Sequence, residues 1–280
     1  MRLIKSSFEI WQQPSGLEGI YKQIERVGRV CYRSEDKITE DSAKPFVNRM
    51  IKSGHGAMLE HGTVYLQFFW AGAVCQQCNQ TAPNKLLDRY AGNKYSIVHY
   101  HGNDVYVTTN LRVLVENNWL DDLKYICEPT EYHERRVTVH FIADAGVMRE
   151  FFRHRVFSMA QESTRYCNYL RDKFSNSITV IYPSWLKEEE ELEFEEDMRV
   201  IEELYFKWLN KGWAAQQARV FLPLGVKAEA VMTGFVSDWK HFFRLRSRIA
   251  ETGKPHPQAQ ELADPLMDEF VKRGIMETLL

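Results

Sequence analysis

An alternating pattern runs directly into a dense group of cationic side chains near the middle of the chain. Residues 137–141 alternate between apolar and polar side chains, which is the pattern of a half-buried strand. The stretch RHRVFSMAQESTRY, residues 153–166, then places four cationic or potentially cationic side chains and two serines within fourteen residues. Because residues 148–152 are partly apolar, we expect this group to lie beside a folded core and not in a disordered tail.

The overall composition is that of a globular protein with a nearly neutral charge. The 280 residues can bury a sizeable core, and 44% hydrophobic with 26% charged residues argues against disorder. The formal net charge of −2 argues against bulk attraction to nucleic acid or to an anionic membrane. Any site for a polyanion is therefore expected to be local.

The cysteine content and the hydropathy pattern bear on the compartment. The five cysteines are too sparse for a disulfide scaffold and suit a reducing compartment; they are Cys31, Cys75, Cys78, Cys127 and Cys167. The opening residues MRLIKSSFEIW lack the apolar core of a signal peptide. No run of eighteen apolar residues is present, so we expect a cytoplasmic protein without membrane contact.

Periodicity predicts an α+β fold in one domain, with a central sheet flanked by helices. Helical spacing of apolar residues predicts helices at 15–32, 42–53, 110–126, 188–204, 239–249 and from 258 onward. Strands are predicted at 63–69, 95–100, 104–109 and 137–141. The acidic run 188–197 is interpreted as the solvated face of its helix, and Pro265 is expected to break or kink the last helix.

Several motifs of common enzyme classes are absent from the sequence. The fifteen glycines form neither a dinucleotide-binding G-x-G-x-x-G nor a P-loop, so a Rossmann fold is not expected. No nucleophile elbow and no H-E-x-x-H zinc helix occur. Cys75-x-x-Cys78 has no second pair, and His99 with His101 has no evident third ligand. We therefore favour structural roles for these residues and expect no metal site.

The residue types around Arg153-His154-Arg155 favour an anionic ligand. Arginine offers a planar fork of donors that fits phosphate oxygens, and this group cannot lie in an apolar core without counter-ions. Ser163, Thr164 and Arg165 add hydroxyl and guanidinium donors. The alternative is a surface network of salt bridges with nearby glutamates.

Two further cationic features occur later in the chain. Arg219 lies in the apolar run Ala218–Pro223 and needs an anionic partner. A helix with aromatic residues carries a second basic group, which composition alone explains as solvated cations; its members are Lys240, His241, Arg244, Arg246 and Arg248. Together these arginine–aromatic groups leave open a non-catalytic nucleotide-binding or nucleic-acid-binding protein, which the net charge disfavours.

Four segments, in order, resemble the flavin-dependent thymidylate synthases. The signature is Arg153-His154-Arg155, seven residues, Ser163 and then Arg165-Tyr166. The other three segments are Ser53-Gly54-His55 with Glu60-His61-x-Thr63, Ala218-Arg219-x-x-Leu222-Pro223 and Phe242-Phe243-x-Leu245-Arg246. The resemblance implies methylation of dUMP to dTMP, with a methylene group from methylenetetrahydrofolate and reducing equivalents from NADPH through bound FAD. It also implies a homotetramer with shared active sites and an α/β core that is not a Rossmann fold.

The resemblance carries site roles over to matching positions. It implies that FAD contacts His61, Thr63, Arg153, His154, Arg155, Val156, Gln161 and His241. It implies that the nucleotide contacts Arg153, Gln161, Ser163, Thr164, Arg165, Arg246 and, from a neighbouring subunit, Arg219. Arg246 is the expected catalytic residue, which stabilises negative charge on the uracil ring as N3 ionises. Ser163 is interpreted as a binding residue and Cys167 as structural.

The chain departs from the family pattern at a few positions. Glu150 stands where the family usually has glutamine, and Ala160-Gln161 replaces asparagine-glutamate. Ser237 replaces an arginine that often contacts FAD, and His241 stands where asparagine is frequent. Residues 1–280 are expected to form a single domain, in which residues 70–134 are an insertion relative to compact members of the family.

Overall fold

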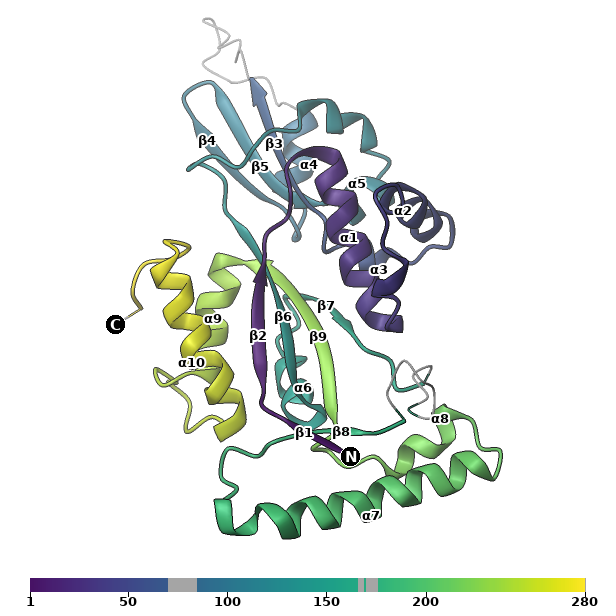
Figure 1. The fold of residues 1–280 in the computed structure, drawn as a ribbon. Coiled ribbons are helices and arrows are strands. Elements are labelled where there is room, and N and C mark those ends of the chain that lie inside the picture. The colour runs from purple at the N-terminus through teal and green to yellow at the C-terminus, as the bar shows by residue number, and fades with distance from the viewer. Residues whose placement is uncertain (70–84, 166–168, 170–175, 280) are drawn as a thin grey trace, which may run out of the picture. The chain divides into compact units, whose positions relative to one another are not determined.

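The structure is a computed structural model of residues 1–280, and its description covers residues 1–69, 85–165, 169 and 176–279 (Figure 1). The chain divides into two compact units. The first unit consists of Met1–Trp11, Arg29–Glu35 and Thr138–Leu280. The second unit consists of Gln12–Gly28 and Asp36–Val137.

The first unit is built on a four-stranded sheet. Its order is β2-β6-β9-β7, and the pairs β2–β6 and β7–β9 are antiparallel; the strands are β2 (Ser7–Trp11), β6 (Arg136–Asp144), β9 (Lys227–Phe235) and β7 (Ser158–Gln161). The first eight residues of β9 are buried, as expected for a strand inside a sheet that is covered on both faces. These antiparallel pairs differ from the parallel sheet of a Rossmann fold and confirm the predicted α+β class.

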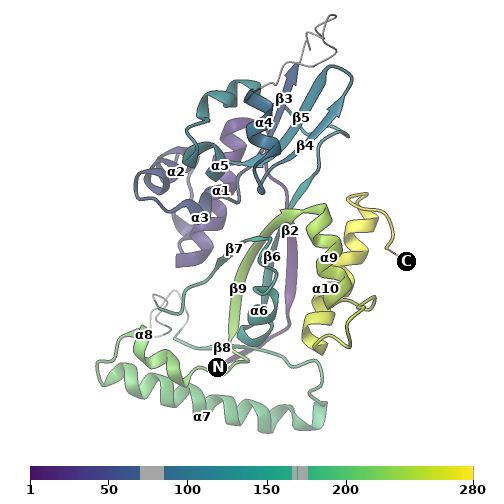
Figure 2. The ribbon, with the colours of Figure 1, turned by 180° about the vertical axis from the view of Figure 1, so that it is seen from behind.

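Three helices pack on this sheet (Figures 1 and 2). They are α6 (Ala145–Phe151), α9 (Val236–Arg246) and α10 (Pro257–Lys272). The ring of Phe242 lies 5.0 Å from that of Phe151 and 5.4 Å from that of Trp239, and all three side chains are buried. Edge-to-face pairs of this kind stabilise a core beyond the area that they bury. This core fixes the ends of α6 and α9, where the signature arginines and Arg246 lie.

The last helix, α10, continues through Pro265, so a break there is wrong, and the alternative of a kink stays a prediction. A proline in a helix interior removes one backbone donor and costs about 3 kcal/mol. Pro265 and Glu261 are exposed, so the carbonyl that loses its donor faces water. Leu262, Leu266 and Phe270 are buried on the opposite side of the helix and hold it in place.

The first unit also contains a two-stranded sheet and further helices. β1 (Arg2–Ile4) pairs in parallel with β8 (Thr179–Ile181), and α8 (Ala215–Ala218) follows α7 (Glu191–Asn210). Short 3₁₀ turns occur at Glu188–Glu190 and Arg219–Phe221. Helix α7 buries Tyr205 and Leu209 and carries the acidic run on its exposed side, as the sequence predicted.

The second unit combines a three-stranded antiparallel sheet with helices. The sheet order is β3-β5-β4. The elements of this unit are most of α1 (Gly16–Tyr32), whose residues from Arg29 onward belong to the first unit, and α2 (Ala43–Lys52), α3 (Gly56–Leu59), β3 (Thr63–Phe69), α4 (Lys85–Ala91), β4 (Ile97–His101), β5 (Asp104–Asn110) and α5 (Leu111–Glu116). Short 3₁₀ turns occur at Glu35–Lys37, where the two units meet in sequence, and at Leu120–Tyr125. The predicted hairpin is confirmed, and Gly102 supplies the positive φ of 59° in its turn.

The predicted helix at 110–126 is split into α5 and a 3₁₀ turn. Asn118 adopts a positive φ of 59°, which ends the α-helix. Residues 85–134 belong to this unit together with α1, α2 and β3. That residues 70–134 are an insertion within a single domain stays a prediction.

A glycine in β9 tests how tightly the first unit packs beside the signature. A Cβ atom on Gly234 would lie 2.5 Å from both Cδ1 and Cε1 of Phe157. Phe157 is itself buried against Trp239, with ring centroids 4.6 Å apart, so it cannot move without cost. We expect Gly234→Ala to lower the free energy of unfolding by about 2 kcal/mol, measured by urea denaturation.

The matched control is Gly225→Ala in the same unit. A Cβ there meets only Cγ1 of Val180, at 3.5 Å, which is an ordinary contact. Its free energy of unfolding should stay within about 0.5 kcal/mol of the wild type. Equal stability of the two variants would show that Phe157 is not held rigidly.

Candidate active site

The signature begins where α6 ends. The Asp144 side chain accepts a hydrogen bond of 2.8 Å from the backbone N–H of Val147 and caps the start of α6. At the other end, the N–H of His154 donates to the carbonyl of Phe151 at 3.0 Å. The chain then turns into β7, which leaves Arg153, Arg155 and Val156 exposed and buries His154. The two arginines therefore face solvent, while the histidine faces the core.

Arg246, at the C-terminal end of α9, is bound by two groups near the signature. Its Nη1 donates to Oε2 of Glu150 at 2.8 Å, and its Nη2 donates to the carbonyl of Glu150 at 3.1 Å. Its Nε donates to Nε2 of His154 at 3.1 Å. Because three of the five guanidinium N–H groups are held, the plane of Arg246 is fixed.

His154 accepts that hydrogen bond as a neutral imidazole. Burial of the ring, and then the neighbouring Arg246 and His241, lower the pKa of His154 to about 4. The ring lies 5.1 Å from Phe242 and 6.2 Å from the ring of His241. A neutral ring with its Nε2 lone pair available is the form that an N–H donor requires.

A hollow of about 560 Å³ lies beside these groups. Glu150, Arg153, Leu245 and Arg246 line one part of it, and residues 252–257 line the rest. Its volume falls within the range of small-molecule sites. Neither Arg153 nor Arg155 forms an ion pair with any residue that the structure describes. The hollow therefore combines the fixed guanidinium of Arg246 with that of Arg153, which is available to an anionic ligand.

A second group of donors follows β7. The N–H of Ser163 donates to the carbonyl of Cys31 at 3.0 Å, and Oγ of Ser163 accepts from the N–H of Arg165 at 3.4 Å. Nη1 of Arg219 donates to Oγ1 of Thr164 at 3.4 Å. The structure thus brings the guanidinium of Arg219 to the hydroxyl of Thr164, next in sequence to Ser163 and Arg165.

The other expected site residues are distributed over both units. Gln161 ends β7 opposite Ala230, and His241 is exposed on α9. His61 and Thr63 belong to the second unit and are buried. Both backbone groups of Thr63 bond to the Gln13 side chain at 2.8 Å, and its hydroxyl accepts from Arg136 at 3.2 Å.

His99 and His101, which the sequence assigned to structural roles, both contact Tyr132. His99 Nδ1 lies 2.8 Å from the carbonyl of Tyr132, and the His101 ring stacks on the Tyr132 ring at 4.1 Å. Among the described residues, no group of three or more His, Cys, Asp or Glu side chains could hold a metal ion. Cys75, Cys78 and Cys167 lie outside the described residues.

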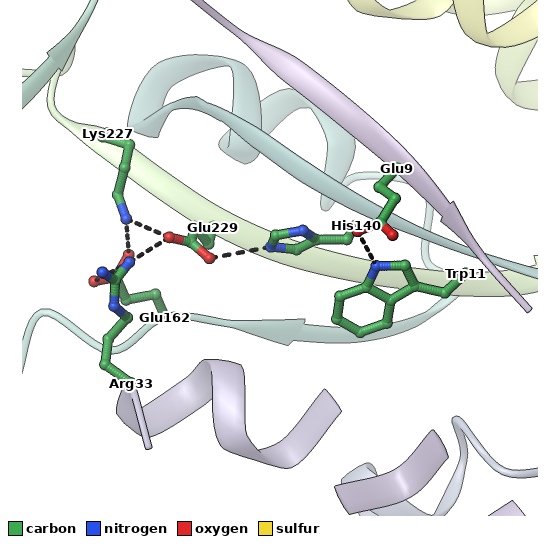
Figure 3. A network of polar contacts seen from close by, with 7 residues as sticks. All are labelled: Glu9, Trp11, Arg33, His140, Glu162, Lys227 and Glu229. Atoms are coloured by element: carbon green, nitrogen blue, oxygen red, sulfur yellow. Dashed lines mark hydrogen bonds and ion pairs between the residues drawn. The ribbon is translucent and has the colours of Figure 1, made fainter. Parts of the chain in front are cut away.

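A buried charge network in the first unit was missed by the sequence interpretation (Figure 3). Glu229 lies 2.6 Å from Nζ of Lys227 and 3.1 Å from Nε2 of His140, and it also pairs with Arg33. Burial alone would raise the pKa of Glu229, but the hydrogen bond from His140 and the charges of Lys227 and Arg33 outweigh it and lower the pKa to about 2. The available signal was Lys227-Ala-Glu229, two charges on one face of an otherwise apolar strand.

The second basic group is largely neutralised by acidic side chains. Arg248 pairs with Asp268, Arg246 pairs with Glu150, and Arg244 lies 3.4 Å from Glu251. These pairs leave little of the positive charge that a nucleic-acid interface requires. Within the part of the chain that the structure describes, no helix combines the length and apolarity needed to cross a membrane.

Comparisons with known proteins agree on one family. The sequence model described as "Thymidylate synthase complementing protein" matches residues 129–273. A flavin-dependent thymidylate synthase of Pyrococcus furiosus is 32% identical over 134 residues, which are 47% of this chain and 52% of that protein. A probable flavin-dependent thymidylate synthase of Paramecium bursaria Chlorella virus 1 is 27% identical over 151 residues, which are 49% of this chain and 66% of that protein. The matches thus span about half to two thirds of the length of these relatives.

Among solved structures, a UMP/dUMP methylase, PolB, from Streptomyces cacaoi aligns with a TM-score of 0.45 and 16% identity, over 97% of this chain and 93% of that chain. The family match covers more than half of the chain and contains the signature at residues 153–166, α9 and α10. The predicted resemblance is therefore confirmed, and the chain belongs to the thymidylate synthase complementing protein family, that of the flavin-dependent thymidylate synthases.

Proposed function

We propose that this protein is a flavin-dependent thymidylate synthase that methylates dUMP to dTMP. The carbon comes from methylenetetrahydrofolate and the reducing equivalents from NADPH, through bound FAD. The observation that carries this proposal is the family match over residues 129–273, which includes the signature and Arg246. The proposal includes a homotetramer, as expected from the resemblance.

The residues around the hollow fit phosphate-bearing ligands. Arg153 and Arg155 are exposed arginines without an ion-pair partner among the described residues, and such groups suit the pyrophosphate of FAD. His154, Val156, Gln161 and His241 complete the flavin contacts that we propose in the first unit. His61 and Thr63 stay predicted flavin contacts, as the resemblance implies. When bound, FAD supplies the redox chemistry that amino-acid side chains lack.

The nucleotide phosphate is assigned to the group that follows β7. Ser163, Thr164 and Arg165 offer two hydroxyls and a guanidinium, and Arg219 lies 3.4 Å from Thr164. Charge-assisted hydrogen bonds of this kind are the strongest that a phosphate forms with protein. Arg153 and Gln161 complete the nucleotide contacts in this assignment. Arg219 donates to Thr164 within its own chain, and its contribution to the site of a neighbouring subunit stays a prediction.

Arg246 is the proposed catalytic residue. Three of its N–H groups are held by Glu150 and His154, and the other two have no partner among the described residues. A guanidinium that is already oriented stabilises negative charge on the uracil ring without reorganising as N3 ionises. The neutral His154 keeps its Nε2 as an acceptor and does not repel Arg246.

Turnover of the purified full-length chain tests the proposal. The protein is supplied with FAD, NADPH, methylenetetrahydrofolate and dUMP, and dTMP is measured by chromatography. We expect dTMP to form, and omission of methylenetetrahydrofolate to abolish it. A flavin-loaded protein that oxidises NADPH and makes no dTMP would contradict the proposal.

A further inference from the structure

Five ionisable side chains from separate parts of the chain meet on one face of the first unit's sheet (Figure 3). Glu162, directly after β7, lies 2.9 Å from Nζ of Lys227 and 4.0 Å from Nη1 of Arg33. Lys227 and Arg33 also pair with Glu229, which His140 contacts at 3.1 Å. The Glu162 side chain is only 2% exposed. Two carboxylates are therefore held between two fixed cations.

Such a cluster is sensitive to the loss of any one charge. Burying charges carries a large desolvation cost, which is offset only while each charge keeps its partner. Arg33 also adopts a left-handed backbone conformation, with a φ of 48°, which is uncommon for a residue other than glycine. A strained conformation persists only where its surroundings fix it, and here the ion pairs of its side chain do so.

The segments that carry the charge network also hold the backbone directly before Ser163, Thr164 and Arg165, the proposed phosphate-binding residues. The N–H of Glu162 donates to the carbonyl of Glu229 at 2.8 Å. The next N–H, that of Ser163, donates to the carbonyl of Cys31 at 3.0 Å. Glu162 is thus fixed through both its backbone and its side chain, one residue before Ser163, Thr164 and Arg165. The donors of this group cannot shift without disturbing the charge network.

We propose that Glu162 is a positioning residue for the nucleotide phosphate, which acts through the Lys227–Glu229–Arg33 network by fixing the loop Ser163–Arg165. This inference rests on the proposed nucleotide role of that loop. Glu162 does not contact the ligand, because its carboxylate is buried against Lys227. Its contribution is to hold the hydroxyl and guanidinium donors in place before the ligand arrives, which reduces the cost of ordering them on binding.

Glu162→Gln tests the proposal through the phosphate specifically. Dissociation constants of dUMP and of deoxyuridine, which lacks the phosphate, are measured by calorimetry with the flavin-loaded protein. We expect binding of dUMP to weaken about tenfold, the size of one well-placed charge-assisted contact, while binding of deoxyuridine is unchanged. Hydrogen–deuterium exchange of the peptide covering 158–165, measured without nucleotide, should become faster.

Combining Glu162→Gln with Lys227→Met restores the charge balance of the network. The double variant therefore distinguishes loss of loop positioning from a simple loss of packing. Glu162→Gln leaves two cations with one carboxylate, and Lys227→Met leaves two carboxylates with one guanidinium. The double variant has one charge of each sign again, so we expect it to bind dUMP better than either single variant. The control is Glu195→Gln, which breaks the exposed pair with Arg199 at 2.8 Å on α7 and should change neither binding nor exchange.

The outcomes distinguish the positioning role of Glu162 from the proposed phosphate role of Ser163–Arg165. Losses that add up in the double variant, or an equal loss for dUMP and deoxyuridine, would overturn the positioning role. Exchange in the Glu162→Gln peptide equal to that of the wild type would overturn it as well, whether or not nucleotide binds. A wild-type protein that binds dUMP no better than deoxyuridine would instead refute the proposed phosphate role of Ser163–Arg165.

Discussion

Arg246→Ala is expected to lower the turnover of dUMP to dTMP at least about 10³-fold, because the substitution removes the fixed charge opposite the uracil ring. The variant also leaves Oε2 of Glu150 and Nε2 of His154 without the donor that both share. Glu150 lines the hollow, where water can replace the donor, so the loss should fall mainly on catalysis. Turnover is measured at saturating dUMP, and the flavin content and melting temperature are recorded for each preparation.

Arg244→Ala is the matched control on the same helix. Arg244 is 51% exposed and lies 3.4 Å from Glu251, which is also exposed. Its removal changes the net charge by the same amount as Arg246→Ala and should leave turnover unchanged. Arg246→Lys adds a second comparison, since it keeps the charge but loses the planar fork. Turnover retained in a folded, flavin-loaded Arg246→Ala protein would remove Arg246 from the catalytic role.

Local sequence signals predicted the longer helices and the strands of the second unit correctly, but did not predict β2, β7 or β9 of the first unit's sheet. The helix expected at 15–32 is α1 (Gly16–Tyr32), and the strand expected at 63–69 is β3. These elements could be predicted because their apolar spacing is strong and is not interrupted. The errors occur where tertiary contacts override a local preference. Helix α10 runs through Pro265 because residues on its buried side hold it, and the helix expected at 110–126 ends where Asn118 turns.

The candidate site was predictable as a motif and not as a set of contacts. The signature predicted that Arg153, His154 and Arg155 belong to one site, and α6 places them on one turn. The pairing of Arg246 with Glu150 joins residues 96 positions apart, so no local pattern contains it. Glu150 was noted only as a departure from the family, whereas in the structure its carboxylate orients the proposed catalytic arginine.

The charge network around Glu229 was even harder to predict from local sequence patterns. Arg33 and Glu229 are 196 positions apart and meet only because β9 lies inside the sheet and the segment after α1 ends beside it. Lys227 and Glu229 in an apolar strand could have been noticed, because a buried charge needs a partner. The identity of the partner depends on strand order, which periodicity does not encode.

The second large effect expected is a loss of stability in mild acid that depends on His154. Its pKa is about 4 in the folded chain against 6.5 for an ordinary histidine, because the ring is buried and lies beside Arg246 and His241. Between these two values the unfolded chain binds a proton at this position and the folded chain does not, so protonation favours unfolding. The contribution of a neutral His154 is therefore complete above pH 6.5 and is lost as the pH falls toward 4. Its size is about 3 kcal/mol.

The comparison of the wild type with His154→Gln isolates this contribution, because every other titrating group is common to both proteins. Free energies of unfolding are measured with urea at intervals between pH 7.5 and pH 4. The wild type should be more stable at neutral pH, and its advantage should shrink by about 3 kcal/mol over that range. Val180→Ala, a buried substitution in β8 that removes no titrating group, should give a curve parallel to the wild type. A constant difference between wild type and His154→Gln would mean that His154 takes up its proton equally well in the folded and the unfolded chain, and that burial and Arg246 do not lower its pKa.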